Sequence, residues 1–232
     1  MAVKVEQLVE NYPRLWHMAH YGSWPAIRDR GLKSASALLD EYKIDGERRT
    51  RLESLRRPGS VQLQRAGLPS AVIRDQLPMT DKKLASCLQD GLTPKDWYEL
   101  LNSRTFFWLS RLRIWTLLQA KAYRALEQTV LTVDTAGLVA AHCDRIWLSP
   151  INSGATLFKA QPRGKTTFCR IADFPFDDRR KTRTPHSAVV ELLVEDAVPD
   201  IAKYVLAVHT VKGDKILDEV WRSPRATDND RP

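Results

Sequence analysis

The stretch Leu15–Leu32, LWHMAHYGSWPAIRDRGL, decides how the fold begins. Its first five residues form a short apolar run that is typical of a buried strand. Ser23 can cap a following helix, Pro25 suits the first helical turn, and Gly31 suits the position just past the helix end. The boundary signals therefore agree on a strand and then a helix, with the polar side chain of His17 inside the strand.

Outward from this unit, the first half of the chain is predicted to be rich in helices. Apolar residues recur at helical spacing, and Thr93-Pro94 supplies a cap followed by proline in the first turn. A Pro-Gly pair at Pro58-Gly59 marks a break, and Val61–Ile73 suits a short strand or a loop. The expected helices are Met1–Arg14, ending near Pro13, Ser34–Arg57, Asp81–Leu88 and Thr93–Leu101.

The second half changes character and is predicted to supply a sheet. β-Branched and aromatic runs predict strands at Thr105–Leu109, Thr129–Val133 and Val189–Val194. Helical patterns cover Arg113–Leu126 and begin again at Asp134–Leu138, whereas Ser149–Gly164 and Asp173–His186 are expected to be loops. The fold class is therefore α+β, with one domain over residues 1–222. Residues 223–232 are expected to be a flexible tail with nothing to bury.

Composition limits the classes of function. Of 232 residues, 43% are apolar, which supports a sizeable core. The net charge of +8 and pI near 9.5 favour phosphate-rich partners, although a basic surface without a partner is an equal alternative. Three cysteines without CxxC spacing favour reduced thiols and predict no metal site. Without a membrane-spanning run or a secretory signal, the sequence predicts a cytoplasmic protein.

Polar residues inside apolar strands are the candidate functional residues, because common motifs such as GxGxxG, the phosphate loop, HExxH and GxSxG are absent. Glu191 stands between Val189-Val190 and Leu192–Val194, where a carboxylate must pair with a cation, bind a ligand or raise its pKa. An ion pair at a sheet end is the structural alternative for Glu191. For His17, the alternative is a hydrogen-bonded core histidine.

Two segments resemble the DarT-like ADP-ribosyltransferases, of which the chain would form a separate bacterial family. Leu15–Ser34 is similar to their opening unit, because the spacing from His17 to Ile27 and to the Gly31-Leu32 pair is reproduced; Ala19 stands where that family has Thr. Ala188–Val194 is similar to their final strand, which carries the catalytic glutamate. The resemblance implies a split mixed or antiparallel sheet and NAD as co-substrate.

The resemblance also implies roles for individual residues. Glu191 would be catalytic and His17 would contact the nicotinamide-side ribose of NAD. Arg74 is our choice for the arginine that completes the catalytic pair and holds the pyrophosphate, with Arg56 and Arg57 as rivals. Further cofactor contacts are expected from Phe107, which could stack on nicotinamide or belong to the core, and from Ser110 and Tyr123.

The chemistry accounts for these residue types. Cleavage of the N-glycosidic bond of NAD passes through an oxocarbenium-like ribose, which a carboxylate can stabilise before it takes the proton of the incoming nucleophile. Phosphates of an acceptor could bind the basic residues of the 173–186 loop, unless that loop is only a solvated charged segment. These substrate-binding candidates are Arg179, Arg180, Lys181 and Arg183, with Phe174 and Phe176 available to stack on bases.

The sequence therefore predicts an NAD-dependent ADP-ribosyltransferase that modifies a nucleic acid. One alternative is a relative that binds or hydrolyses NAD without transfer. Another is a non-enzymatic nucleic-acid-binding module in which Glu191 is structural. The expected partners are NAD, a nucleic acid and an antitoxin or other regulatory protein, with no membrane. A toxin, a defence or a housekeeping role, and the oligomeric state, stay open.

Overall fold

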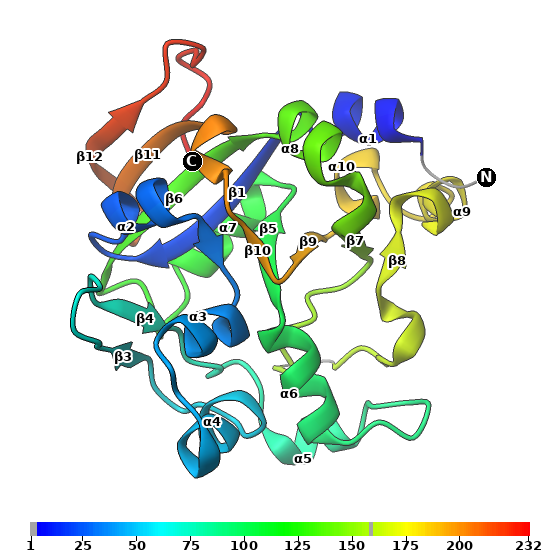
Figure 1. The fold of residues 1–232 in the computed structure, drawn as a ribbon. Helices are drawn as coiled ribbons and strands as arrows, with labels where there is room; N and C mark the ends of the chain where they lie inside the picture. The colour runs from blue at the N-terminus through cyan, green and yellow to red at the C-terminus, as the bar shows by residue number, and fades with distance from the viewer. Residues whose placement is uncertain (1–3, 158–159) are drawn as a thin grey trace.

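The computed structural model describes residues 4–157 and 160–232, and its centre is a large sheet (Figure 1). Within those residues the sheet has eight strands in the order β12-β11-β6-β1-β5-β9-β7-β8, and each neighbouring pair is antiparallel. In chain order the strands are β1 (Arg14–His20), β5 (Arg104–Trp108), β6 (Glu127–Asp134), β7 (Ile146–Ser149), β8 (Cys169–Arg170), β9 (Glu191–Glu195), β11 (Val205–Lys212) and β12 (Lys215–Arg222). The predicted α+β class is confirmed.

Helices surround this sheet, and many of them precede its second strand, as predicted. They are α1 (Val5–Asn11), α2 (Trp24–Arg30), α3 (Ala35–Glu41), α4 (Gly46–Glu53), α5 (Asp81–Ala85), α6 (Pro94–Asn102), α7 (Arg111–Leu118), α8 (Thr135–His142), α9 (Phe176–Arg180) and α10 (Pro185–Ala188). Two small sheets pair β2 (Leu32–Lys33) with β10 (Ala197–Val198) and β3 (Val61–Leu63) with β4 (Ala71–Ile73). No helix in the described part of the chain is long and apolar enough to cross a membrane.

The pairing of strands in the sheet is interrupted between β1 and β5. Strand β1 pairs with β6 along its whole length, from Arg14 opposite Asp134 to His20 opposite Gln128. In the described residues its register with β5 consists of a single pair, Trp16 opposite Trp108. Beyond Trp16 the two strands diverge, so the sheet divides into a β12-β11-β6-β1 half and a β5-β9-β7-β8 half.

Side-chain alternation on β1 connects the cores on the two faces of the sheet. Leu15 and Ala19 belong to the largest buried cluster, which also contains residues of α1, α8 and β9. Trp16 and Met18 pack on the other face with Ile114 of α7. Because β1 is covered on both sides, its sequence is an almost continuous apolar run.

The strand and helix predicted from the opening stretch are confirmed, with one difference at the cap. The Ser23 hydroxyl donates to the His20 carbonyl oxygen at 2.6 Å and does not cap α2. Gly31 ends α2 at φ 84° and ψ 162°, a conformation that is almost confined to glycine. A Cβ atom at Gly31 would lie 2.6 Å from the Cα atom of Pro199, beside the β2–β10 pair.

Among the predicted helices that are shorter than expected, two depart most from the prediction, for local reasons. The 34–57 segment forms α3 and α4, because Lys43 (φ 55°) and Gly46 (φ 55°) turn the chain between them. This turn lets Leu39 and Leu52 bury in one small core with the β3–β4 hairpin. The 113–126 pattern is helical only to the end of α7 at Leu118, and turns follow.

Two segments predicted to be loop or tail carry structure. The 173–186 segment contains α9 and the start of α10, and Phe174 and Phe176 are both 0% exposed. The expectation that they stack on bases is therefore wrong, because their rings are core. In the 223–232 segment, Asp230 is 2% exposed and its carboxylate binds Arg14. The expectation that this tail has nothing to bury is also wrong.

We predict that Gly31→Ala lowers the free energy of unfolding by about 3 kcal/mol or more, because it adds a clash with the Pro199 backbone to the strain of positive φ. The matched change Gly46→Ala, at φ 55° with open space around it, should cost about 1 kcal/mol. Chemical denaturation at equilibrium measures both values. Equal losses would show that the β2–β10 contact does not constrain Gly31.

Candidate active site

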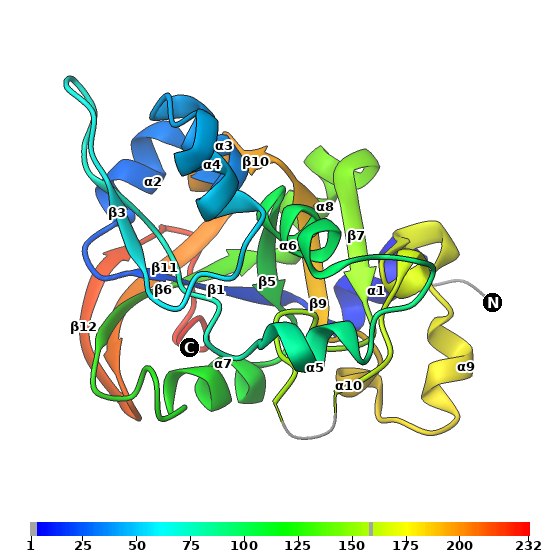
Figure 2. The ribbon, with the colours of Figure 1, turned by 90° about the horizontal axis from the view of Figure 1, so that it is seen from below.

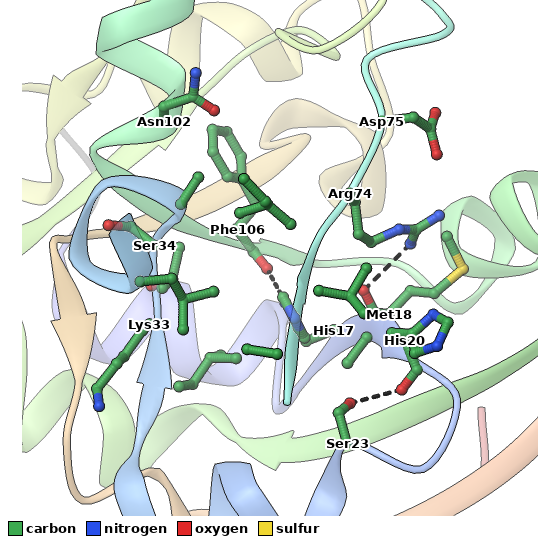
Figure 3. Close-up of a pocket in the computed structure, with 18 of the residues that line it drawn as sticks. His17, Met18, His20, Ser23, Lys33, Ser34, Arg74, Asp75, Asn102 and Phe106 are labelled. Carbon is green, nitrogen blue, oxygen red and sulfur yellow. Dashed lines mark hydrogen bonds between the residues drawn. The ribbon is translucent and has the colours of Figure 1, made fainter. Parts of the chain in front are cut away.

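A cavity of about 510 Å³ occupies the opening between β1 and β5 (Figure 3). Its walls come from β1, α2, the β2–α3 segment, the β3–β4 hairpin with the residues after it, and β5. The 152–155 turn and Glu191 also line it. This volume lies in the range of small-molecule sites. A small ligand therefore fits where β1 and β5 separate.

His17 lines this cavity from β1 as a neutral ring. Its Nδ1 lies 2.8 Å from the carbonyl oxygen of Phe106, across the gap between the two strands (Figure 3). A carbonyl can only accept, so Nδ1 carries the proton and Nε2 is left as a hydrogen-bond acceptor. Burial lowers the pKa of His17 to about 4, a shift opposed by the Phe106 carbonyl and increased by the charge of Arg74. The ring can therefore accept a hydrogen bond from a ligand hydroxyl at neutral pH.

Glu191 is the first residue of β9, and its side chain is 3% exposed at the cavity wall. Both carboxylate oxygens lie 3.1 Å from the backbone nitrogen of Ser153, which donates to them. Burial raises the pKa of Glu191 to about 7, while hydrogen bonds from Ser153 and the charges of Arg113 and Arg163 act in the opposite direction. Near neutral pH this carboxyl can therefore both take and give a proton.

The structural alternative for Glu191 was an ion pair at a sheet end. Among the salt bridges within the described ranges, none includes Glu191. The compensation for its burial comes instead from a peptide N–H and from charges farther away. This environment favours a site residue over a structural ion pair.

A buried arginine shapes the turn that holds Glu191. Arg163 is 1% exposed and donates to three carbonyl oxygens: Ser153 at 2.8 Å, Ala155 at 2.9 Å and Gln161 at 3.1 Å. The indole N–H of Trp97 also donates to the Ser153 oxygen, at 3.3 Å. These bonds hold the carbonyl side of Ser153 in place, next to the Ser153 N–H that donates to the carboxylate.

Arg74 follows β4 and lines the same cavity. Its guanidinium donates to the Met18 carbonyl oxygen at 3.3 Å (Figure 3). The guanidinium carbon also lies 4.8 Å from the centre of the Tyr123 ring. Burial lowers the pKa of Arg74, opposed by the hydroxyl of Tyr123 and the charge of Asp75. Of the five N–H groups of a guanidinium, one has a hydrogen-bond acceptor within the described residues. The others remain available for an anion.

The two rival arginines are engaged in holding the backbone. Arg57 is 6% exposed and donates to the carbonyl oxygens of Leu52 and Arg74 and to the Asn102 side chain. Arg56 donates to the carbonyl oxygens of Met79 and Leu77. Their contacts leave Arg74 as the better candidate for binding a ligand.

The aromatic side chains of β5 alternate between the two faces of the strand. Phe107 is 1% exposed and packs in the largest core cluster, with its ring centre 5.7 Å from that of His17. Its burial favours the core alternative. Phe106 and Trp108 alternate with Phe107 and are half-buried, and all three residues line the cavity. Sequence reasoning did not choose Phe106 and Trp108, although period-2 alternation in the same run could have done so.

The structure brings Tyr123 into the cavity but leaves Ser110 out of it. Tyr123 is 5% exposed, and its hydroxyl donates to the Asp75 carboxylate at 2.7 Å. Its ring faces the Arg74 guanidinium. Ser110 precedes α7 and is not among the residues that line the cavity.

The basic residues of α9 and the turn after it do not all behave alike. Arg179 donates to the carbonyl oxygens of Ala188 at 2.6 Å and Pro150 at 2.9 Å, so it anchors the entry to β9. Lys181 forms an ion pair with Asp178. Arg180 and Arg183 are exposed and form no ion pair within the part of the chain that the structure describes. These two cations are the ones most open to an acceptor.

Three polar residues around Glu191 were also not predicted: Arg113, Ser153 and Arg163. Arg113 on α7 is half-buried, and its charge lowers the pKa of Glu191. Arg163 and Ser153 lie in a segment that was predicted only as loop, where polar residues are ordinary. Among the described residues, no group of three or more His, Cys, Asp and Glu side chains is arranged to hold a metal ion.

The fold and site define an α+β protein with a ligand-sized cavity at the division of an antiparallel sheet. Residues 13–205 match the model of a protein family described as "Family of unknown function (DUF7002)", and the chain belongs to that family. The match runs from β1 to the first residue of β11 and includes the whole cavity lining. A search of curated proteins finds no match.

We predict that Glu191→Gln stabilises the fold more at pH 8 than at pH 4. Because burial raises the pKa of this acid in the folded state to about 7, the folded chain binds more protons than the unfolded chain between about pH 4.5 and 7, and stability is lost as pH rises through that range. The gain of Glu191→Gln should therefore grow by up to about 3 kcal/mol. Denaturation at both pH values measures it, and Glu10→Gln on the exposed side of α1 controls for the lost charge. If Glu191→Gln stabilises the fold equally at both pH values, Glu191 does not have a raised pKa in the folded state.

Proposed function

We propose that this protein transfers ADP-ribose from NAD to a nucleic acid, with Glu191 as the catalytic carboxylate. One observation carries the proposal: His17, Arg74 and Glu191, which are far apart in the sequence, line a single cavity. The opening of the sheet between β1 and β5 also agrees with the split sheet that the resemblance to ADP-ribosyltransferases implies.

The cavity suits a ligand that has hydroxyl, phosphate and amide groups. Neutral His17 offers Nε2 to a ribose hydroxyl, and Arg74 offers N–H groups to a pyrophosphate. Beyond Trp16, β1 has no register partner on its β5 side within the described residues, so its backbone can bind a carboxamide as an added strand would, beside the Met18 carbonyl that accepts from Arg74. NAD carries all of these groups in one molecule.

Glu191 supplies the group that the reaction needs. When the bond between nicotinamide and ribose breaks, the bonding electrons leave with nicotinamide and the ribose becomes an oxocarbenium-like cation. The ionised Glu191 stabilises that charge from a buried position, where electrostatic interactions are strong. The acceptor then bonds to the ribose carbon and loses a proton to Glu191, whose pKa of about 7 suits a general base.

A concentration of positive charge beside Glu191 supports an acidic acceptor. Arg113 lowers the pKa of Glu191, and Arg183 lowers the pKa of both Arg113 and Arg179, although burial is the main cause for those two arginines. Among the described residues, no carboxylate forms an ion pair with any of the three arginines. Phosphate groups would relieve this repulsion, and a nucleic acid provides them in series.

The basic test is incubation with NAD that carries a label on the adenosine part, with DNA, RNA or protein as acceptor. Label on a nucleic acid supports the proposal. Release of nicotinamide without transfer would favour the NAD-hydrolysing alternative. Nucleic-acid binding that falls with salt, without NAD turnover and unaffected by Glu191→Gln, would favour the binding-module alternative.

We predict that Glu191→Gln lowers the transfer rate by about 100-fold or more, because it removes both the charge and the base. The matched control is Glu195→Gln on the same strand, whose carboxylate binds Trp147 and Arg170 away from the cavity lining. His17→Ala should raise KM for NAD more than it lowers kcat. Initial rates of nicotinamide release and of label transfer measure these effects, and full transfer by Glu191→Gln would refute the catalytic role.

We predict that Arg180→Gln combined with Arg183→Gln weakens transfer to nucleic acid but leaves nicotinamide release into water unchanged. Each lost phosphate contact should reduce the slope of log affinity against log salt by about 0.9. The control pair, Arg48→Gln with Arg51→Gln, removes the same charge from exposed positions on α4, which lies far from α9 in both ribbon views (Figures 1 and 2). Equal effects of the two pairs would mean that only net charge matters.

A further inference from the structure

The chain between β4 and α5 crosses the cavity as a strap, residues 74–80. Arg74, Asp75, Gln76, Pro78 and Met79 all contribute to the lining. Figure 2 shows this segment running from the projecting β3–β4 hairpin towards α5. The strap therefore places Arg74 in the wall of the cavity.

The backbone of the strap is tied down at several points. Gln76 donates from its backbone N–H to the Arg57 carbonyl oxygen at 2.8 Å, and its side-chain oxygen accepts from the Arg57 N–H at 3.0 Å. The Arg57 guanidinium donates to the Arg74 carbonyl oxygen at 3.0 Å. Farther along, the backbone N–H of Thr156 donates to the Pro78 carbonyl oxygen at 2.8 Å. The path of the strap is therefore set independently of any ligand.

The side chain of Arg74 is held from a different element. Tyr123, in the connection between α7 and β6, lies with its ring 4.8 Å from the Arg74 guanidinium carbon. The hydroxyl of the same tyrosine donates to the Asp75 carboxylate at 2.7 Å. One buried aromatic side chain thus contacts two successive residues of the strap. Both contacts limit how Tyr123 and Arg74 can turn.

We propose that Tyr123 is a positioning residue that presents the Arg74 guanidinium to the pyrophosphate of NAD, with Asp75 fixing the ring. The ring supports the guanidinium by a cation–π contact without using its N–H groups, so those groups stay available to the anion. This proposal rests on the proposed function. It differs from the expectation that Tyr123 contacts the cofactor directly, because a face of its ring lies against Arg74.

The arrangement explains why a tyrosine, and not a phenylalanine, suits this position. A phenylalanine ring at this position could swing away from the guanidinium about its Cα–Cβ bond, but the hydrogen bond to Asp75 holds the far end of the tyrosine side chain in place. Burial, with the hydrogen bond and the charge of Asp75, raises the pKa of Tyr123, so the hydroxyl remains a donor at physiological pH. Asp75 also accepts from the Leu77 N–H at 3.1 Å, which keeps the carboxylate in place on the strap.

A double-mutant cycle of the full chain tests the proposal: wild type, Arg74→Gln, Tyr123→Leu and the double variant, with calorimetric affinities for ADP-ribose and for nicotinamide. Tyr123→Leu should weaken ADP-ribose binding about ten-fold in the wild type and less than two-fold in the Arg74→Gln background. Nicotinamide, which has no phosphate, should bind all four proteins alike. A merely structural tyrosine would not separate the two ligands.

Tyr123→Phe keeps the test valid if Tyr123→Leu does not fold, because the ring remains. It should weaken ADP-ribose binding about two- to three-fold, and Asp75→Asn should do the same. Additive losses from Arg74→Gln and Tyr123→Leu, or equal losses for nicotinamide, would overturn the positioning role alone. If the wild type binds neither ADP-ribose nor NAD, the proposed function fails and the positioning role fails with it.

Discussion

The whole arrangement depends on one constraint, which is that β1 can pair fully with only one of its two neighbours. Its seven-residue register with β6 sets its path, and its register with β5 in the described residues is the single pair of Trp16 and Trp108. Past that pair the strands separate, and the separation creates the cavity. The bond from His17 Nδ1 to the Phe106 carbonyl bridges the gap and also fixes the tautomer of the ring, whose neutral form is favoured by burial. The gap between β1 and β5 thus determines both where the cavity lies and which nitrogen of His17 can accept a hydrogen bond.

The separation of β1 and β5 leaves the polar side chains of Glu191 and Arg74 beside a buried cavity. Neighbouring residues hold the segments that carry these two side chains. The guanidinium groups of Arg163 and Arg57 donate hydrogen bonds to backbone carbonyl oxygens. Each arginine thereby sets the shape of a segment at the site. Burying an arginine is costly unless its donors are satisfied. Here the satisfied arginines fix the 152–155 turn beside Glu191 and the strap behind Arg74. Glu191 and Arg74 keep part of their bonding capacity for a ligand, which distinguishes site residues from scaffold.

The electrostatic character of the site follows from burial more than from direct ion pairs. Burial is the main cause of the opposite pKa shifts of His17, to about 4, and Glu191, to about 7. At neutral pH the first is a neutral acceptor and the second is balanced between acid and base. Arg113 and Arg74 act on these groups at a distance. Such a site is adapted to a ligand that brings its own negative charge, which agrees with a dinucleotide and a phosphate-bearing acceptor.

The sequence by itself determined the local elements whose signals are short-range: the β1–α2 unit, the capped start of α6 with its reciprocal Thr93–Asp96 bonds, and the apolar strand that contains Glu191. It also singled out His17 and Glu191, because a polar group inside an apolar strand is visible as a pattern. Only the tertiary structure decided that Phe174 and Phe176 are core, that Arg179 anchors backbone, and that Tyr123 supports Arg74. Those roles depend on which distant segment packs against each side chain. Local spacing cannot specify that, since the same arginine or aromatic is compatible with a surface, a core or a site until its neighbours are known.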